Sequence, residues 1–192
     1  MDPKIAETTI VHKIFGGCLQ SQVKCLTCNF KSNTIDPFLD LCLEIQGNSL
    51  QSCLSKFTQP EILDKDNKYK CPGCKKLVRA QKQFTIRDAP RVLTIQLKRF
   101  NFLSLYGGKI DKLIPFPEKL DMGPYLSKDE PRTQSCIYKL YAVLVHWGSS
   151  TRSGHYYSFV KSSANIWHCM DDSTVRCSYF IILNIKSYIY ID

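Results

Sequence analysis

Four cysteines in two short pairs are the residues of this sequence with the clearest chemistry. Cys25 and Cys28 enclose Leu-Thr, and Cys71 and Cys74 enclose Pro-Gly. A Cys-x-x-Cys turn presents two thiolates to one ion, and four thiolates are a common ligand set of a closed, tetrahedral Zn²⁺ site. Four sulfur ligands leave no open position for water, so the pattern predicts a structural zinc ion. The alternative is a set of unrelated buried or redox-active cysteines.

A histidine and two carboxylates form the second candidate cluster. His155 opens the apolar segment 155–161, and Asp171 and Asp172 follow the next apolar segment, 166–170. In an antiparallel pair, the start of one strand lies beside the end of the next. An imidazole that meets a carboxylate there is half of a catalytic triad, able to take a proton from a nucleophile. On spacing alone, a structural histidine remains the alternative.

Neighbouring residues complete the description of these two clusters. Gly154, before the histidine, is expected to let its loop approach a substrate backbone closely. His146 ends an apolar segment, and His168 lies within one, so both are interpreted as packed or surface histidines. The six cysteines outside the two pairs are interpreted as small core or surface residues, with Cys53 on the apolar face of a helix.

Periodicity indicates which elements position these residues. Residues 10–15 and the segment that Ser49 caps, with Leu50, Cys53, Leu54 and Phe57 at helical spacing, predict two helices. Alternating or continuous apolar segments predict strands, with turns between them at residues 29–33, 47–48 and 88–90. The class is therefore α+β, dominated by antiparallel strands, in one domain with two subregions. The predicted strands run into Cys25 and over residues 39–45, 78–86, 92–100, 138–146, 155–161, 166–170 and 188–191.

Composition restricts the classes of function. The 192 residues are 44% hydrophobic, which is enough to close a core, and ten cysteines in a chain of this size favour reduced thiols. We expect no membrane segment and no signal peptide, hence an intracellular protein. The net charge of +9 permits an acidic partner, but the Lys and Arg residues are scattered. Nucleic acid is therefore a disfavoured partner.

The motifs, taken in order along nearly the whole chain, resemble those of the ubiquitin-specific proteases. These are papain-like cysteine peptidases that cleave the bond after the C-terminal glycine of ubiquitin. The resemblance rests on the two cysteine pairs and on six further strings, which are Ile-Phe-Gly-Gly from residue 14, Asp-Pro-Phe-Leu-Asp-Leu from 36, Leu-Thr-Ile-Gln-Leu-Lys-Arg-Phe from 93, Tyr-Ala-Val-Leu-Val-His from 141, Ser-Gly-His-Tyr-Tyr from 153 and Met-Asp-Asp-Ser from 170.

The resemblance implies a partial catalytic domain over residues 1–192. Residues of about 16–90 are similar to the family's zinc-ribbon fingers, and residues of about 91–192 to its palm. His155 matches the catalytic base, Asp171 the third triad member and Asp172 the acidic residue beside it. Ubiquitin and ubiquitinated proteins are the implied partners, and the nucleus or the cytoplasm is the implied compartment.

The sequence departs from the family's pattern in two respects. The nucleophile motif, of the kind Gly-Asn-Thr-Cys, does not occur in the 192 residues, and most of the helical thumb is missing with it. Without a thiolate, the histidine has nothing to activate, so we expect this chain alone to be inactive in peptide-bond cleavage. An Ile-rich stretch, 179–192, also replaces the helix that usually precedes the family's last strand, which leaves the register of that strand open.

Three functions compete at this point. The chain is part of a deubiquitinating enzyme, a catalytically inactive module that binds ubiquitin, or a zinc-ribbon protein that binds nucleic acid. An in-frame cysteine motif in the coding sequence upstream of Met1 would favour the enzyme. Salt-sensitive retention on nucleic acid would favour the third function.

Overall fold

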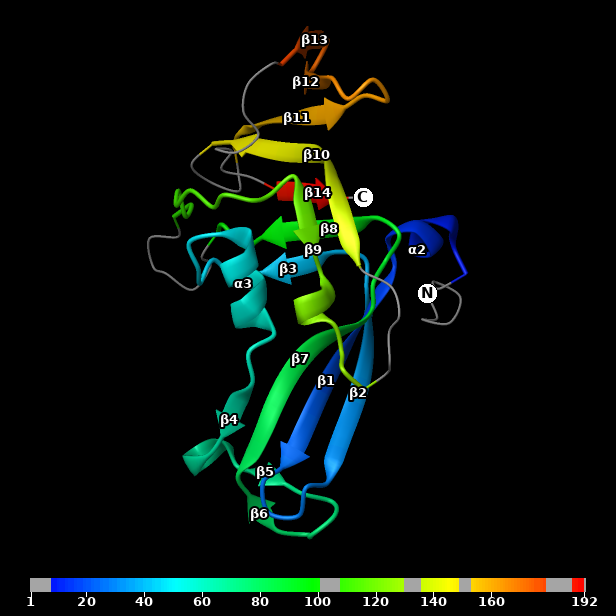
Figure 1. Ribbon diagram of the computed structural model, residues 1–192. Helices are drawn as coiled ribbons and strands as arrows, with labels where there is room; N and C mark the ends of the chain where they lie inside the picture. Colours follow the sequence, from blue (N-terminus) through cyan, green and yellow to red (C-terminus); the bar gives the residue numbers. More distant parts are fainter. Residues whose placement is uncertain (1–7, 101–107, 130–135, 149–152, 179–187, 192) are drawn as a thin grey trace.

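The computed structural model describes residues 8–100, 108–129, 136–148, 153–178 and 188–191 (Figure 1). The α+β class dominated by antiparallel strands is confirmed, since short helices accompany a large sheet, a small sheet and a two-stranded hairpin. In the described residues, no helix has the length and apolar character needed to cross a membrane. The helical elements of this part are α2 (Ile10–Phe15), α3 (Leu50–Phe57) and the 3-10 turns η1 (Lys65–Asn67) and η2 (Gly123–Tyr125). The strands are β1 (Gly17–Cys25), β2 (Lys31–Phe38), β3 (Leu41–Leu43), β4 (Glu61–Leu63), β5 (Tyr69–Lys70), β6 (Leu77–Val78), β7 (Ala80–Asp88), β8 (Leu93–Leu97), β9 (Lys119–Asp121), β10 (Ile137–Trp147), β11 (His155–Lys161), β12 (Trp167–Asp171), β13 (Thr174–Cys177) and β14 (Tyr188–Ile191).

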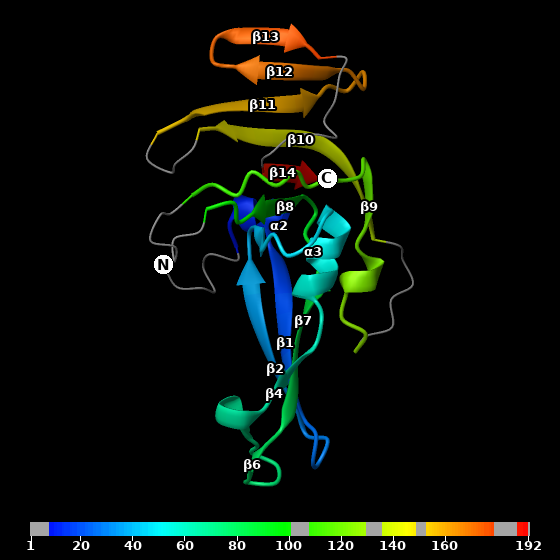
Figure 2. The ribbon, with the colours of Figure 1, turned by 90° about the vertical axis from the view of Figure 1, so that its left-hand side faces the viewer.

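The small sheet forms a long, narrow projection below the large sheet (Figure 1). Its strand order is β2-β1-β7-β4, and every neighbouring pair is antiparallel. The turn after β1 and the β5–β6 hairpin lie together at its far end, away from the large sheet (Figure 2). The two Cys-x-x-Cys pairs occupy these two turns, so the fold brings them to one place.

The large sheet has the order β13-β12-β11-β10-β14-β8-β3, with β9 on a separate stretch of β10. Strand β14 lies between β10 and β8, and its register pairs Ile189 with Val143 and Ile95. The sequence left open the register of the family's last strand. In the structure this strand, β14, is an inner strand of the large sheet. At the other end, β11 and β12 form the antiparallel pair that the sequence predicts.

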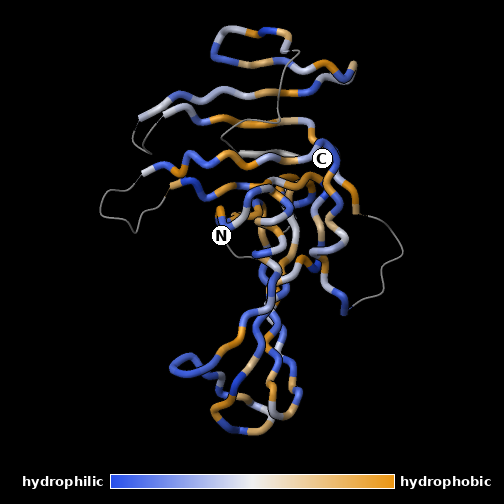
Figure 3. Tube along the Cα trace, turned by 60° about the vertical axis from the view of Figure 1, so that its left-hand side comes forward, coloured by the Kyte–Doolittle hydropathy of each residue, from blue (hydrophilic) through white to orange (hydrophobic). Residues whose placement is uncertain are grey.

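The main core lies where α3 packs on the large sheet. Ser49 caps α3 by accepting from the Ser52 backbone, and the Ser52 side chain accepts in return from the Ser49 backbone. Leu50, Cys53 and Leu54 are fully buried, as the i, i+3, i+4 spacing predicts. Figure 3 shows long hydrophobic stretches along the inner strands of this sheet. A separate, small core at the tip of the projection consists of Cys25, Cys71 and Val78, with Tyr69 and Cys74 against it.

Several strands differ from the predictions. The predicted turn over residues 29–33 ends early, because β2 begins at Lys31, and the predicted strand over 39–45 shrinks to β3. Strand β2 is exposed or half-buried along its whole length, so it carries no apolar period that could identify it. Moreover, β3 joins the large sheet through β8 although it lies within the 16–90 span.

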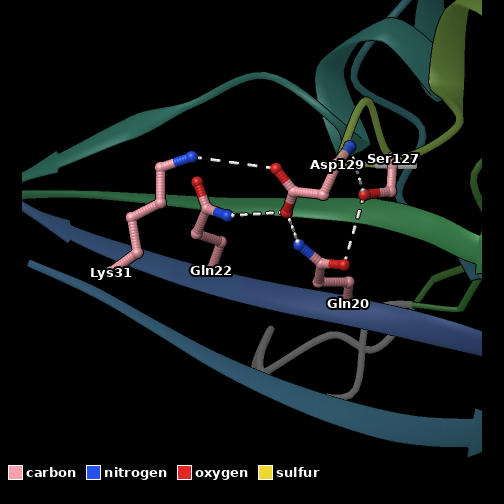
Figure 4. Close-up of polar contacts among 5 residues, drawn as sticks. All are labelled: Gln20, Gln22, Lys31, Ser127 and Asp129. Carbon is pink, nitrogen blue, oxygen red and sulfur yellow. Dashed lines mark hydrogen bonds and ion pairs between the residues drawn. The ribbon is translucent and has the colours of Figure 1, made fainter. Parts of the chain in front are cut away.

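The projection is attached to the main body by a polar cluster around Asp129 (Figure 4). The Gln20 side-chain amide donates to the Asp129 carboxylate at 2.6 Å, and Gln22 donates to the same oxygen at 3.0 Å. The Ser127 hydroxyl donates to Oε1 of the Gln20 side chain at 3.2 Å. Lys31 adds an ion pair of 3.7 Å. Gln20 is buried, so its amide needs these partners.

Replacing Asp129 by alanine is expected to destabilise the protein by about 1–3 kcal/mol, because the buried Gln20 amide loses its acceptor. Urea denaturation measures the change in the free energy of unfolding. Lys128→Ala is the matched control, since this neighbouring side chain is exposed, and it should change stability by less than about 0.5 kcal/mol. Equal midpoints for both variants would show that the cluster contributes nothing to stability.

Candidate metal centre and candidate catalytic cluster

The four cysteines of the two pairs meet at the tip of the projection. Their sulfur atoms all lie within 4.8 Å of one another, and Cys28 and Cys71 approach to 3.6 Å. Four sulfurs at about 2.3 Å from a tetrahedral Zn²⁺ lie about 3.8 Å apart. Cys25 and Cys71 are completely buried, while Cys28 is exposed. This donor set fits one metal ion with a closed coordination shell.

The local backbone prepares these thiols for a cation. The backbone N–H groups of Cys28 and Thr27 both donate to Cys25 Sγ at 3.4 Å. These bonds, that of Cys28 first, and side-chain hydrogen bonds with Cys28 and Cys71 lower the pKa of Cys25 to about 6, although burial opposes the shift. Asn29 and Lys75, each following a pair, adopt the left-handed conformation that closes the two turns, with φ of 59° and 61°.

The neighbouring thiols shift the titration of Cys28. A backbone hydrogen bond with Phe30 lowers the pKa of Cys28, but hydrogen bonds with Cys25, Cys71 and Cys74, together with burial, raise it to about 11. A bound divalent cation would favour the thiolate form of every ligand. The four thiols are therefore a candidate site for one divalent cation.

The second predicted cluster also assembles. His155 begins β11 and Asp171 ends β12, and His155 Nε2 is hydrogen-bonded to the Asp171 carboxylate. In the β11–β12 register, Ser158 lies opposite Met170, so Tyr157 lies opposite Asp171. His155, Tyr157 and Asp171 consequently share one face of the sheet. Because Nε2 is engaged by the carboxylate, a proton from a nucleophile would be taken by Nδ1.

Nearby charges shift the titration of the imidazole. The hydrogen bond with Asp171 raises the pKa of His155, burial opposes that shift, and the charges of Asp171 and Asp172 add to it. Asp172 follows β12 in the left-handed conformation, with φ of 49°, and its carboxylate lies within 4.8 Å of the reactive atoms of both partners. The His155 side chain is 39% exposed, so a reacting group can reach it.

His146 is packed and His168 is partly exposed, which agrees with their interpretation as packed or surface histidines. His146 is buried, with 5% exposure, and His12 and His168 are half-buried. Gly154 was expected to let its loop approach a substrate backbone. In the structure, the neighbour that a side chain at this position would meet first is the His146 ring. Sequence reasoning did not connect these two residues, because only the pairing of β10 with β11 brings them together. Most of the loop between them, residues 149–152, lies outside the described part.

Comparison with known sequences finds related proteins over nearly the whole chain. A family model described as ubiquitin carboxyl-terminal hydrolase matches residues 2–191. Probable ubiquitin carboxyl-terminal hydrolase 16 of Schizosaccharomyces pombe is 48% identical over 190 residues, which are 98% of this chain and 41% of that protein. Ubiquitin carboxyl-terminal hydrolase 25 of Arabidopsis thaliana is 49% identical over 183 residues, or 94% of this chain and 27% of that protein. The chain thus spans less than half the length of these relatives.

Solved structures show the same fold. The chain matches a structure of the SAGA Ubp8/Sgf11/Sus1/Sgf73 DUB module bound to ubiquitin aldehyde with a TM-score of 0.85 and 36% identity. The match covers 96% of this chain and 42% of the matched chain. The matched structure therefore shares the fold of nearly the whole chain.

Proposed function

The chain belongs to the ubiquitin carboxyl-terminal hydrolase family, and on that premise we propose that it provides the ubiquitin-holding and proton-transferring part of a thiol-dependent deubiquitinase. The observation that supports this proposal best is the His155–Asp171 pair at the end of two neighbouring strands. The fold of the family and the four-cysteine cluster agree with it.

The proposed chemistry begins with a cysteine thiol that the Gly-Asn-Thr-Cys type of motif supplies in this family. That motif does not occur in these 192 residues. Nδ1 of His155 takes the thiol proton, and the thiolate attacks the carbonyl carbon of ubiquitin's last glycine. The imidazolium then gives its proton to the leaving amine, and water hydrolyses the thioester. Asp171 fixes the ring and stabilises the imidazolium, while Asp172 adds negative charge beside them.

The metal centre has a structural role in this proposal. Cys25, Cys28, Cys71 and Cys74 would hold one Zn²⁺ and so fix the tip of the projection. The projection corresponds to the proposed fingers, within residues 16–90, and the large sheet to the palm, within 91–192, to which β3 and α3 also contribute. The ion takes no part in bond cleavage, because four sulfurs complete its coordination.

Ubiquitin and ubiquitinated proteins are the proposed partners. Support comes from the matched structure, which is described as bound to ubiquitin aldehyde. An intracellular place of action, in the nucleus or the cytoplasm, is part of the proposal, because four zinc-binding thiols require reducing conditions.

Binding of ubiquitin tests the proposal on this chain without need of a nucleophile. Adding the chain to isotope-labelled ubiquitin should give saturable NMR shifts in one contiguous surface and in the C-terminal tail. The Cys74→Ser variant should bind more weakly, since it loses the fixed tip. No shifts at about 1 mM chain would contradict the proposal. Salt-sensitive retention on DNA in place of ubiquitin binding would favour the nucleic-acid function instead.

A further inference from the structure

We propose that His146 is a positioning residue for His155 and that it acts through Gly154. The His146 ring occupies the place where any side chain at position 154 would lie, and it thereby sets the start of β11. The inference rests on the proposed role of His155 as the base, but its geometry can be tested separately from catalysis.

The pairing of β10 with β11 places the two histidines on opposite faces of the sheet. Trp147 lies opposite His155, and His146 lies opposite Tyr156. Because side chains alternate along a strand, a side chain at Gly154 would point to the same face as His146 and Tyr156. The His146 side chain therefore lies on the face of the sheet opposite to that of the His155 side chain.

Steric contact couples the ring to the glycine. A methyl group on Gly154 would overlap His146 Nε2, and would lie 2.8 Å from Cε1 of the same ring and 2.9 Å from the Trp147 carbonyl oxygen. A methyl group on Gly148 would lie 3.1 Å from His146 Cε1. Gly148 and Gly154, before and after the loop, thus leave room for the His146 ring because neither carries a side chain. The absence of a side chain at 154 lets β11 begin directly against this ring.

The ring itself is held on several sides. Phe100 meets it edge-on, with ring centres 5.6 Å apart, and the Tyr156 ring lies at 4.7 Å. Lys109 Nζ donates to the His146 backbone carbonyl at 2.6 Å. Burial, and to a lesser degree Lys109, lower the pKa of His146, so the ring is neutral at neutral pH. A neutral ring with fixed neighbours is a rigid support for the strand.

A displaced Gly154 would move His155, its neighbour along the chain. The orientation of His155 is read out by its pKa, which the hydrogen bond with Asp171 raises above the ordinary value. A support that moves would loosen that hydrogen bond, and the pKa of His155 would fall toward about 6.5.

NMR titration of the 192-residue chain measures this pKa directly. Gly154→Ala should lower the pKa of His155, because the new methyl group pushes the strand away from His146. In the double variant with His146→Ala and Gly154→Ala, the methyl group gains the space of the imidazole, and of its three nearest contacts only that with the Trp147 carbonyl oxygen remains. The pKa should therefore return part of the way toward that of the unchanged chain. His168→Ala, which replaces a half-buried histidine on β12, is the control and should leave it unchanged.

Each outcome decides the matter. A His155 pKa that Gly154→Ala leaves unchanged, or that the double variant fails to restore even in part, overturns the inference. If Gly154→Ala does not fold, recovery of folding and of the His155 pKa in the double variant supports the inference, and failure to recover overturns it. A merely structural effect would lower the melting temperature and leave the pKa of the folded protein unchanged. Because no ubiquitin is present, the result stands apart from the ubiquitin-binding test of the proposed function.

Discussion

Replacing His155 by alanine is expected to lower turnover about 10⁴-fold in a complete enzyme, because no other group would take the proton of the nucleophile. The complete enzyme can be made by joining the N-terminal part of the Schizosaccharomyces pombe relative, which should supply the cysteine motif, to this chain. Turnover is measured with ubiquitin that carries a fluorogenic amide at its C-terminus. The affinity for ubiquitin should remain nearly unchanged, because the imidazole acts on the proton and not on the body of ubiquitin.

Two further variants make this prediction sharper. Asp171→Asn should have a milder effect, since an amide still orients the ring, but the loss of the negative charge should lower the pKa of His155. The imidazole would then stay in its basic form down to a lower pH than in the unchanged enzyme, and the acidic limb of the pH–rate profile should move to lower pH. His168→Ala should retain full turnover. A His155→Ala enzyme with undiminished turnover would remove His155 from the mechanism, and an inactive parent enzyme would favour the inactive ubiquitin-binding module.

Periodicity and motifs predicted those parts of the structure that depend on neighbouring residues. Helix α3 follows its capping serine and apolar spacing, and β11 begins at His155 as expected. The prediction that His155 and Asp171 meet needed only one assumption, namely that two consecutive strands pair antiparallel. Each cysteine pair was visible in the sequence as a turn. The two pairs lie more than 40 residues apart, but they could be assigned to one site because a closed zinc site needs four thiolates and one pair supplies only two.

Other parts depend on contacts that no local pattern records. Strand β2 is exposed or half-buried along its whole length because it lies at the edge of the projection, and only its pairing with β1 makes it a strand. The Asp129 cluster joins residues more than 100 positions apart. The contact between His146 and Gly154 follows from strand register, which the sequence of either segment leaves undetermined.

Removal of the metal from the cysteine cluster should unfold the tip of the projection and leave the large sheet intact. The tip core contains, among described residues, only Cys25, Cys71 and Val78 as buried apolar groups, and two of these three belong to the candidate metal site. So small a core cannot close by hydrophobic burial alone. Structural zinc binding contributes apparent free energies of about 10–16 kcal/mol in zinc-finger peptides, and folding of the tip would depend on a comparable contribution.

Cys25→Ser should therefore abolish the expected one zinc ion per chain, measured by native mass spectrometry, and chelation should have the same structural effect. Hydrogen exchange should show loss of protection in β5, β6 and the turn after β1, while β10 and β11 keep theirs, because their core contains no ligand. Cys177→Ser is the matched control, since this exposed cysteine lies outside the cluster. Full zinc content in Cys25→Ser would exclude the site. Loss of zinc with an unchanged exchange pattern would show instead that the tip folds without the ion, which its three-residue core gives no physical reason to expect.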